Sequence, residues 1–368
     1  MGLMQILGHI ADHQSHDGDG YAYYIEGNMD TWRSTLAKLK SGTTGIFNVC
    51  CIGDSITEGD KAGNSHNDYR TKGFVGRLRT RLAATFGDVG LGFIPVHFSD
   101  DYPAFSFTGT WIDSSWYGIG NYQKRSSNTG ATATVSFNGT GIGVVVARNN
   151  IAAQYTISID GGAAVTHDTY NATLVSPYAY EETGLADTDH TAVITVDNGA
   201  NPTRNLYFLG IYPIKGTTGI RVHDCARSGG RASDFVQTGC LDLEINYWTP
   251  VLTIVSLVAN DFNFQTGLSA YETSMSQIID TARTHGSCMV LANGLFNVSK
   301  TIPITAYEEV CRKLALSKGC AFLNLNRRWK SYSNANSLGY MADALVHPNQ
   351  AGHQDIATFL LDHLLEER

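Results

Sequence analysis

Short runs of apolar residues alternate with segments of helical spacing over much of this chain. The run at 45–52 is rich in Ile, Val and Phe, and the sequence Gly-Asp-Ser closes it, which predicts a fully buried strand. Apolar residues then recur three or four positions apart over 73–87, as they do on one face of a helix. From about residue 216 onward, buried strands and helices alternate again. This alternation predicts a parallel sheet with helices on both of its faces.

A different pattern occupies the middle of the chain. Between about 101 and 215, short segments alternate apolar and polar residues, as half-buried strands do. Several such segments in succession predict an antiparallel β-sandwich. Because a strand and a helix of the α/β pattern precede it, the sandwich is expected to be an insertion. Hairpin or tight turns are predicted at three dipeptides, Asn138-Gly139, Asp160-Gly161 and Asn198-Gly199.

These patterns divide the chain into three parts. We predict a polar and helical N-terminal extension over 1–45, an α/β domain built from 46–100 and 216–368, and the inserted β-sandwich over 101–215. The chain has 368 residues, 43% of them hydrophobic, which is enough to bury at least one substantial core. Its length predicts two domains, or one large domain with an insertion.

The composition restricts the partners and the chemistry. A formal net charge of −8, without any long run of basic residues, argues against binding to nucleic acid. No apolar stretch approaches the ~18 residues that a membrane span needs. The seven Cys are odd in number, several lie in apolar runs, and their spacing is not that of metal ligands. We therefore expect buried free thiols and no metal site.

The first twenty residues lack both the basic region and the continuous apolar region of a secretory signal. We therefore expect synthesis in the cytoplasm, and release by lysis would make an extracellular or virion-associated location compatible with this sequence. The oligomeric state is left open.

Candidate chemical groups follow or precede the predicted elements at three places. Ser55 comes after the first strand, Asn260 after the apolar strand at 250–258, and His347 just before the last helix. Because parallel strands end at the same edge of a sheet, these side chains are expected to meet there. Each also has a plainer interpretation: Ser55 could cap a helix, Asn260 could form an Asx turn, and His347 could lie in a surface loop.

Three more residues complete the hypothesis. Asp343 lies four residues before His347, close enough to hydrogen-bond Nδ1 and leave Nε2 free to accept a serine proton. Gly229 could present a backbone N–H to an oxyanion or belong to an ordinary turn. Asp54 could contact the substrate or shape the turn before Ser55.

Four blocks of the sequence resemble, in order, those of the SGNH hydrolases, also called GDSL-type esterases. "GDSITEG" is similar to the first block, "ARSGGRASDF" to the second, "VANDF" to the third and "DALVHPNQAG" to the last. The resemblance implies a three-layer α/β fold with a central parallel sheet. It also implies roles for five residues: Ser55 as nucleophile, His347 as base, Asp343 as its acid partner, and the oxyanion hole from Ser55, Gly229 and Asn260.

Two departures from the family pattern affect the site. Val258 stands where the third block usually opens with Gly, so the turn before Asn260 is expected to differ slightly. The acid usually lies three residues before the His, whereas Asp343 lies four before His347. Either this carboxylate or a backbone carbonyl is therefore expected to orient the imidazole.

The inserted segment resembles jelly-roll modules that accompany carbohydrate esterases and some phage tail proteins. Its aromatic side chains could stack on sugar rings or fill the core of the sandwich, the candidates being Trp111, Trp116, Tyr117 and Tyr122. The resemblance implies hydrolysis of O-acetyl esters on a carbohydrate through an acyl-enzyme, without a cofactor. The alternatives are a general short-chain carboxylesterase and a non-catalytic glycan-binding protein of the phage tail or adhesin type.

Overall fold

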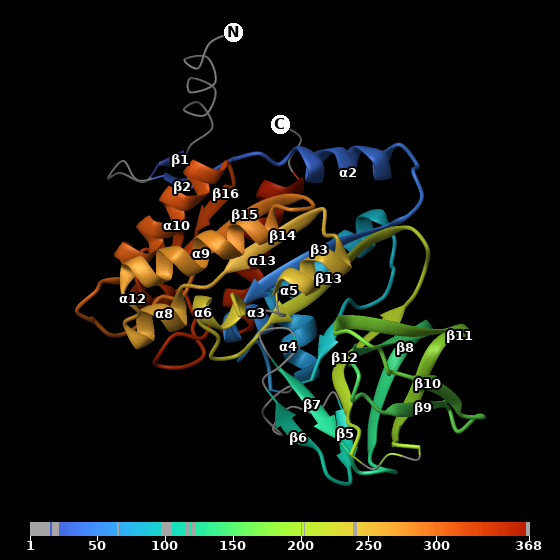
Figure 1. Ribbon diagram of the computed structural model, residues 1–368. Coiled ribbons are helices and arrows are strands. Elements are labelled where there is room, and N and C mark those ends of the chain that lie inside the picture. The colour runs from blue at the N-terminus through green and yellow to red at the C-terminus, as the bar shows by residue number, and fades with distance from the viewer. Residues whose placement is uncertain are drawn as a thin grey trace.

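Two β-sheets organise the chain, one mostly parallel and one antiparallel (Figure 1). The computed structural model describes residues 15–16, 22–64, 66–96, 105–114, 118, 122–199, 201, 203–237 and 241–365. Trp116, Tyr117 and Cys240 lie outside the described residues, as does most of the extension before residue 22. The predicted fold class, an α/β fold with an inserted antiparallel β-rich part, is confirmed.

The first sheet, sheet A, contains five parallel strands in the order β13, β3, β14, β15, β16. Two antiparallel strands, β2 and β1, extend it beyond β16. The chain order reverses between β3 and β14, and in open parallel sheets ligands bind beyond the carboxyl ends of the strands at such a reversal. The strands of sheet A are β1 (Ser15–His16), β2 (Ala22–Ile25), β3 (Ile46–Gly53), β13 (Gly219–Ala226), β14 (Leu252–Ser256), β15 (Ser287–Ala292) and β16 (Ala321–Asn324).

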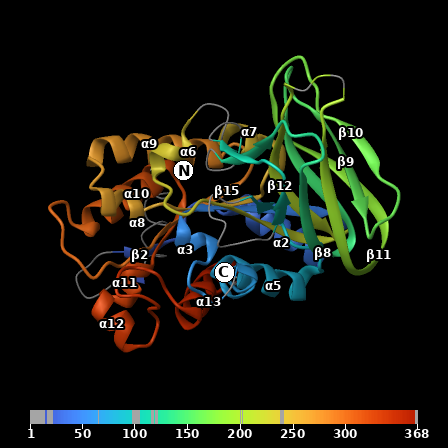
Figure 2. The ribbon, with the colours of Figure 1, turned by 90° about the horizontal axis from the view of Figure 1, so that it is seen from below.

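Helices cover both faces of sheet A, which explains why its strands are apolar without alternation (Figure 2). Val49 and Cys51 of β3 belong to the apolar cluster under α2, α5 and α13, whereas Cys50 and Ile52 belong to the cluster under α7, α9 and α10. The long helices are α2 (Asp30–Lys40), α5 (Phe74–Phe86), α7 (Leu241–Trp248), α9 (Leu268–Ala282), α10 (Ile304–Lys318) and α13 (Gln350–Leu365). The short helices are α3 (Ser55–Glu58), α4 (His66–Lys72), α6 (Ala232–Phe235), α8 (Ala259–Phe264), α11 (Leu325–Trp329) and α12 (Tyr332–Ser337).

The second sheet, sheet B, has nine strands and is antiparallel throughout. The sandwich expected here is one continuous hydrogen-bonded sheet that curls around its own apolar cluster (Figure 2). Its strands are β4 (Ile94–Pro95), β5 (Phe105–Thr108), β6 (Ile112–Ser114), β7 (Gln123–Ser126), β8 (Thr132–Arg148), β9 (Gln154–Ile159), β10 (Val165–Asp168), β11 (Val175–Asp197) and β12 (Leu206–Ile214).

One of the three predicted turns is wrong. Asn138-Gly139 lies inside β8, which continues unbroken past it, although the pairing with β11 shifts register there. Gly139 adopts φ +152, and a Cβ on it would lie 2.4 Å from the carbonyl oxygen of Ile214. The glycine therefore marks a bulge and a close backbone approach within a strand, which resembles a turn in sequence. The dipeptides Asp160-Gly161 and Asn198-Gly199 directly follow the ends of β9 and β11, as predicted.

The two sheets share apolar contacts. Leu209 and Tyr212 of β12 belong to the same buried cluster as Cys225 of sheet A. Trp248, the last residue of α7, lies between them: its ring stacks on His223 of β13 at 4.0 Å and meets Tyr212 edge-on at 5.5 Å. These contacts hold sheet B against the α/β layers, and the domain boundaries themselves stay a prediction.

The composition predicted the state of the cysteines and the lack of a membrane span. Six cysteines fall within them, and all six are free and buried, which confirms the prediction of buried free thiols for those positions. None of the helices in the described part of the chain is both long and apolar enough to cross a bilayer.

Candidate active site

Ser55 stands at a sharp turn between the end of β3 and the start of α3. Asp54 is the N-cap residue of α3: its backbone is extended and its Oδ1 accepts the N–H of Ile56 at 3.0 Å. A Cβ at Gly53 would lie 2.0 Å from Oγ1 of Thr57, so the close packing of this turn requires glycine. Because Asp54 caps the helix, the Ser55 hydroxyl is available for another partner.

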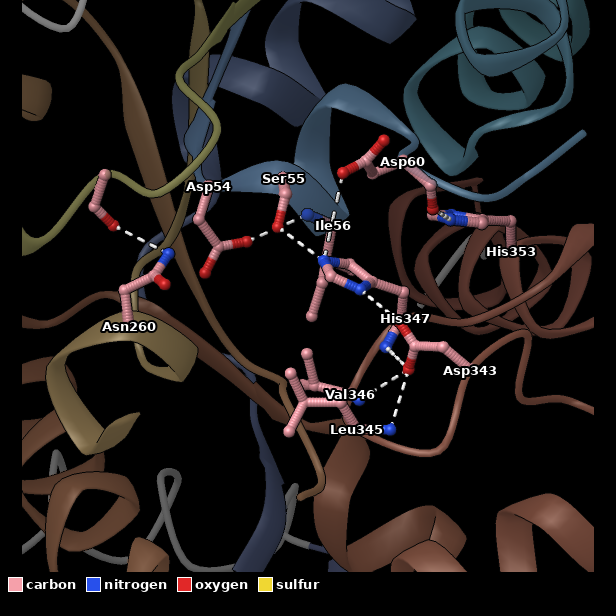
Figure 3. Close-up of polar contacts among 11 residues, drawn as sticks. Asp54, Ser55, Ile56, Asp60, Asn260, Asp343, Leu345, Val346, His347 and His353 are labelled. Atoms are coloured by element: carbon pink, nitrogen blue, oxygen red, sulfur yellow. Dashed lines mark hydrogen bonds and ion pairs between the residues drawn. The ribbon is translucent and has the colours of Figure 1, made fainter. Parts of the chain in front are cut away.

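His347 provides that partner (Figure 3). Its Nε2 lies 3.0 Å from Oγ of Ser55, and its Nδ1 lies 2.5 Å from Oδ2 of Asp343. These contacts join side chains that are 292 positions apart in sequence at one edge of sheet A. The hydrogen-bond partner of Nδ1 is therefore the Asp343 carboxylate and not a backbone carbonyl, which was the alternative.

Asp343 also shapes the loop that carries His347. Its Oδ1 accepts three backbone N–H groups, those of Leu345 at 2.9 Å, Val346 at 2.8 Å and His347 at 3.1 Å. This turn explains how an acid four residues before the histidine can reach the ring. Although partial burial raises the pKa of Asp343, the hydrogen bonds from the ring and backbone outweigh it and lower that pKa below its usual range. The carboxylate is therefore ionised at neutral pH.

Asp54 has the opposite electrostatic environment. Complete burial raises its pKa to about 7, although the N–H of Ile56 and the positive charge that His347 can carry act to lower it. A fully buried carboxyl group that caps a helix favours a structural role over the predicted substrate contact.

Asn260 and Gly229 lie on two segments that hydrogen bonds connect. The Asn260 side chain, near the start of α8, donates to the carbonyl oxygen of Gly230 at 3.2 Å. The loop that contains both glycines is joined to β3 by a bond from Arg227 N to Gly53 O of 2.9 Å. Gly229 adopts φ +73, and the N–H of Gly230 is bonded to Arg227, so Gly229 is the glycine with a backbone N–H to offer.

The departure at Val258 has a simple explanation. Its backbone lies at φ −119 and ψ −44, a region that every residue can adopt, so the turn before Asn260 does not require glycine. The Val258 side chain is fully buried and packs in the cluster beneath α9 and α10. Asp261 then ties α8 to the second block, since its Oδ2 accepts the N–H of Ala232 at 2.8 Å.

The sequence did not identify Asp60 and His353 as neighbours of the site. Oδ2 of Asp60 lies 3.9 Å from Nε2 of His347. The backbone N–H of Asp60 donates to the carbonyl oxygen of Ser55 at 2.9 Å. His353 of α13 is fully buried, and its Nε2 lies 3.4 Å from the carbonyl oxygen of Asp60. Burial lowers the pKa of His353 to about 4, so this ring is neutral and can donate to that oxygen. The sequence offered one indication that Asp60 lies near the site, namely that it directly follows the first block.

The described aromatic residues of sheet B have partners of their own. The Trp111 indole N–H lies 3.1 Å from Thr108 O, and its ring packs on Phe107 at 5.2 Å. Tyr122 is 5% exposed, and its hydroxyl donates to Asp113 at 2.7 Å. These contacts fit the core-filling alternative, and sugar contact by Trp111 stays a prediction.

Comparisons with known proteins show what this chain is similar to in sequence and in fold. The sequence model of the GDSL-like Lipase/Acylhydrolase family matches residues 212–354, which include Asn260, Asp343 and His347. A solved structure titled "Peptidoglycan O-acetylesterase in action, 5 min" is similar at 18% identity and a TM-score of 0.63, over 92% of this chain and 97% of that one.

Two carbohydrate esterases of family 2 are similar at lower TM-scores. The enzyme from Corynascus thermopiles (Myceliophthora fergusii), solved with a carbohydrate binding domain, has 15% identity and a TM-score of 0.31, over 70% of this chain and 100% of that one. The enzyme from Clostridium thermocellum in complex with cellohexaose has 12% identity and a TM-score of 0.31, over 71% and 98%. Comparison with curated protein sequences gives no match.

Proposed function

We propose that this chain, which carries a GDSL-like lipase/acylhydrolase domain and has the fold of a solved O-acetylesterase, is a serine esterase that removes short acyl groups from a carbohydrate. One observation supports the catalytic part above all. Ser55 Oγ lies 3.0 Å from His347 Nε2, and Nδ1 of the same ring lies 2.5 Å from an ionised Asp343. A serine, a base and an orienting acid in this geometry are the groups that nucleophilic acyl transfer requires.

In the first step, Ser55 Oγ bonds to the ester carbonyl carbon while His347 Nε2 takes the hydroxyl proton. The carbonyl oxygen becomes an oxyanion, which would accept hydrogen bonds from the N–H groups of Ser55 and Gly229 and from the Asn260 amide. Asn260 has two amide hydrogens and uses one on Gly230, so the second is free for this purpose. The oxyanion then re-forms the carbonyl and the ester C–O bond to the sugar oxygen breaks. The imidazolium gives its proton to that leaving oxygen, and the acyl group stays bonded to Ser55 Oγ.

In the second step, water attacks the acyl carbon while His347 takes one of its protons. Collapse of this intermediate breaks the bond to Ser55, whose oxygen recovers a proton from His347, and the carboxylic acid leaves. Asp343 keeps the ring in the tautomer with hydrogen on Nδ1. Asp60, at 3.9 Å from Nε2, adds attraction for the imidazolium that forms in both steps.

The substrate proposed is an O-acetylated polysaccharide. Its support is the solved structure whose similarity covers 92% of this chain. Sheet B extends from β4 to β12, so a match of this length must include most of sheet B as well as the α/β part. That neighbour is a peptidoglycan O-acetylesterase, so acetylated peptidoglycan is the first substrate to test, followed by other acetylated polysaccharides.

The test measures acetate release from acetylated polysaccharides and p-nitrophenol release from p-nitrophenyl acetate. We expect Ser55→Ala to lower both rates by about 10⁴-fold or more, with its unfolding curve unchanged. Ser269→Ala, an exposed serine on α9, is the matched control and should leave both rates unchanged.

The outcomes separate the alternatives. Unchanged turnover in Ser55→Ala would reject the proposed mechanism. A preference of the natural chain for longer p-nitrophenyl esters over every acetylated polymer would instead identify a general carboxylesterase. Polymer binding without turnover of any ester would identify a glycan-binding protein.

A further inference from the structure

An aromatic ring stands exposed one helical turn beyond Asn260. Phe264 is the last residue of α8, and 62% of it is exposed. Asn260 and Phe264 are four positions apart on this helix, so their side chains lie on the same face, with Cβ atoms about 6 Å apart. Asp261 and Phe262 of the same helix are buried, so this face is the one that α8 turns away from the core.

The loop of the second block supplies a guanidinium group to the same ring. Arg231 Cζ lies 5.3 Å from the centre of the Phe264 ring, a distance at which a cation is attracted to an aromatic face. The Arg231 backbone is held in place because its N–H donates to Asp234 at 2.8 Å. Arg231 directly follows Gly230, whose carbonyl oxygen accepts the Asn260 amide, so both members of the pair extend from the segments proposed to hold the oxyanion.

Position, rather than exposure alone, makes this pair informative. Single exposed apolar side chains are common on protein surfaces. This one, however, lies on the same short helix as Asn260, and it is paired with a side chain that carries five N–H donors. An aromatic face beside a fork of donors matches a sugar ring, which has an apolar C–H face and hydroxyl groups at its edge.

We infer that Phe264 and Arg231 form a carbohydrate subsite, which binds a sugar ring of the polymer next to the scissile acetyl ester. This inference rests on the proposed esterase function and names the part of the substrate that lies beyond the ester. The ring of Phe264 packs on the C–H face of the sugar, and Arg231 donates to its hydroxyl oxygens. A small alkyl ester such as ethyl acetate has no ring to pack there and gains nothing from the pair.

The test compares two substrates in Phe264→Ala. We expect KM for the acetylated polysaccharide to rise about tenfold with kcat little changed, while the kinetics of acetate release from ethyl acetate stay within twofold of the natural chain. Arg231→Gln should raise the polymer KM in the same direction. Phe264→Trp should restore polymer binding, because a larger aromatic face is kept. Leu316→Ala, an exposed apolar residue of α10, is the control for surface truncation.

An equal loss on both substrates in Phe264→Ala, or an unchanged KM for the polymer, would overturn the subsite. Failure of the esterase function itself is read separately, from Ser55→Ala on ethyl acetate, a substrate without a ring for Phe264 to bind.

Discussion

At the scale of single residues, Asp343 forms hydrogen bonds both to the imidazole of His347 and to the loop that carries it. One oxygen accepts three backbone N–H groups and the other faces Nδ1 of His347. Ser55, His347 and Asp343 could be predicted from sequence because each lies in a short block whose local turn places it. Asp60 and His353 could not, because their approach depends on how α13 packs beside the loop after α3.

The Asp343→Asn variant tests the orienting role. The amide oxygen can still accept the loop N–H groups, but its NH₂ group would face Nδ1 and favour the tautomer with hydrogen on Nε2. That tautomer cannot take the Ser55 proton, so we expect turnover of p-nitrophenyl acetate to fall about 10³- to 10⁴-fold with KM little changed. A fall of less than tenfold would mean that another group orients the ring.

The Asp60→Asn variant tests the second carboxylate near His347. Removal of its charge should weaken the stabilisation of the imidazolium, and we expect kcat to fall roughly tenfold, equivalent to about 1.4 kcal/mol. Asp187→Asn, which removes an exposed partner of Lys215, is the control and should not change kcat. Equal rates for Asp60→Asn and the control would assign Asp60 a purely backbone role.

At the scale of elements, the turn from β3 into α3 contains a buried carboxyl group, Asp54, whose ionisation is unfavourable in the folded chain. Asp54 must cap α3 from a site without solvent, and its pKa rises from 3.8 to about 7. Between these values the unfolded chain releases the proton while the folded chain keeps it, so this residue makes folding less favourable as pH rises. The pattern that predicted a strand closed by Gly-Asp-Ser could not indicate this, because burial depends on the neighbouring elements.

The Asp54→Asn variant should remove this pH dependence and keep the cap through its amide oxygen. We expect the difference in free energy of unfolding, variant minus natural chain, to increase as pH rises from about 4 to about 8. The increase should be at most about 4 kcal/mol. Urea unfolding at several pH values measures the difference. Parallel pH curves for the two proteins would show that Asp54 is ionised without cost in the folded state.

Strand and helix boundaries were predicted best where burial on both faces gives a continuous apolar run, as in β3. They were predicted worst in sheet B, where Gly139 carries the signal of a turn but lies within a strand. A bulge and a hairpin both favour glycine at positive φ, and only the partner strands distinguish them.

At the scale of the whole molecule, the sheets are joined through the apolar cluster around Trp248. This side chain contacts Phe93, Tyr212 and His223, which come from both sides of the junction. Periodicity could separate two kinds of sheet in the sequence. It could not predict how they pack, because the contacts join residues far apart in the chain.

Trp248→Ala tests this junction. Loss of a buried indole typically costs about 3–5 kcal/mol, and we expect a fall of that size in the free energy of unfolding, measured by urea denaturation. Trp111→Ala, a partly exposed tryptophan at the edge of sheet B, is the matched control and should cost less. Equal losses in the two variants would contradict a special role for the junction.

The activation of Ser55 by His347 is tested most directly by covalent labelling with a fluorophosphonate ester, which reacts with serine hydroxyls that a base has activated. Intact-mass and peptide analysis should give one adduct per chain, on the peptide that contains Ser55, with much slower labelling in His347→Ala and none in Ser55→Ala. An adduct on a different residue, or an equal labelling rate without the imidazole, would contradict the proposed catalytic pair.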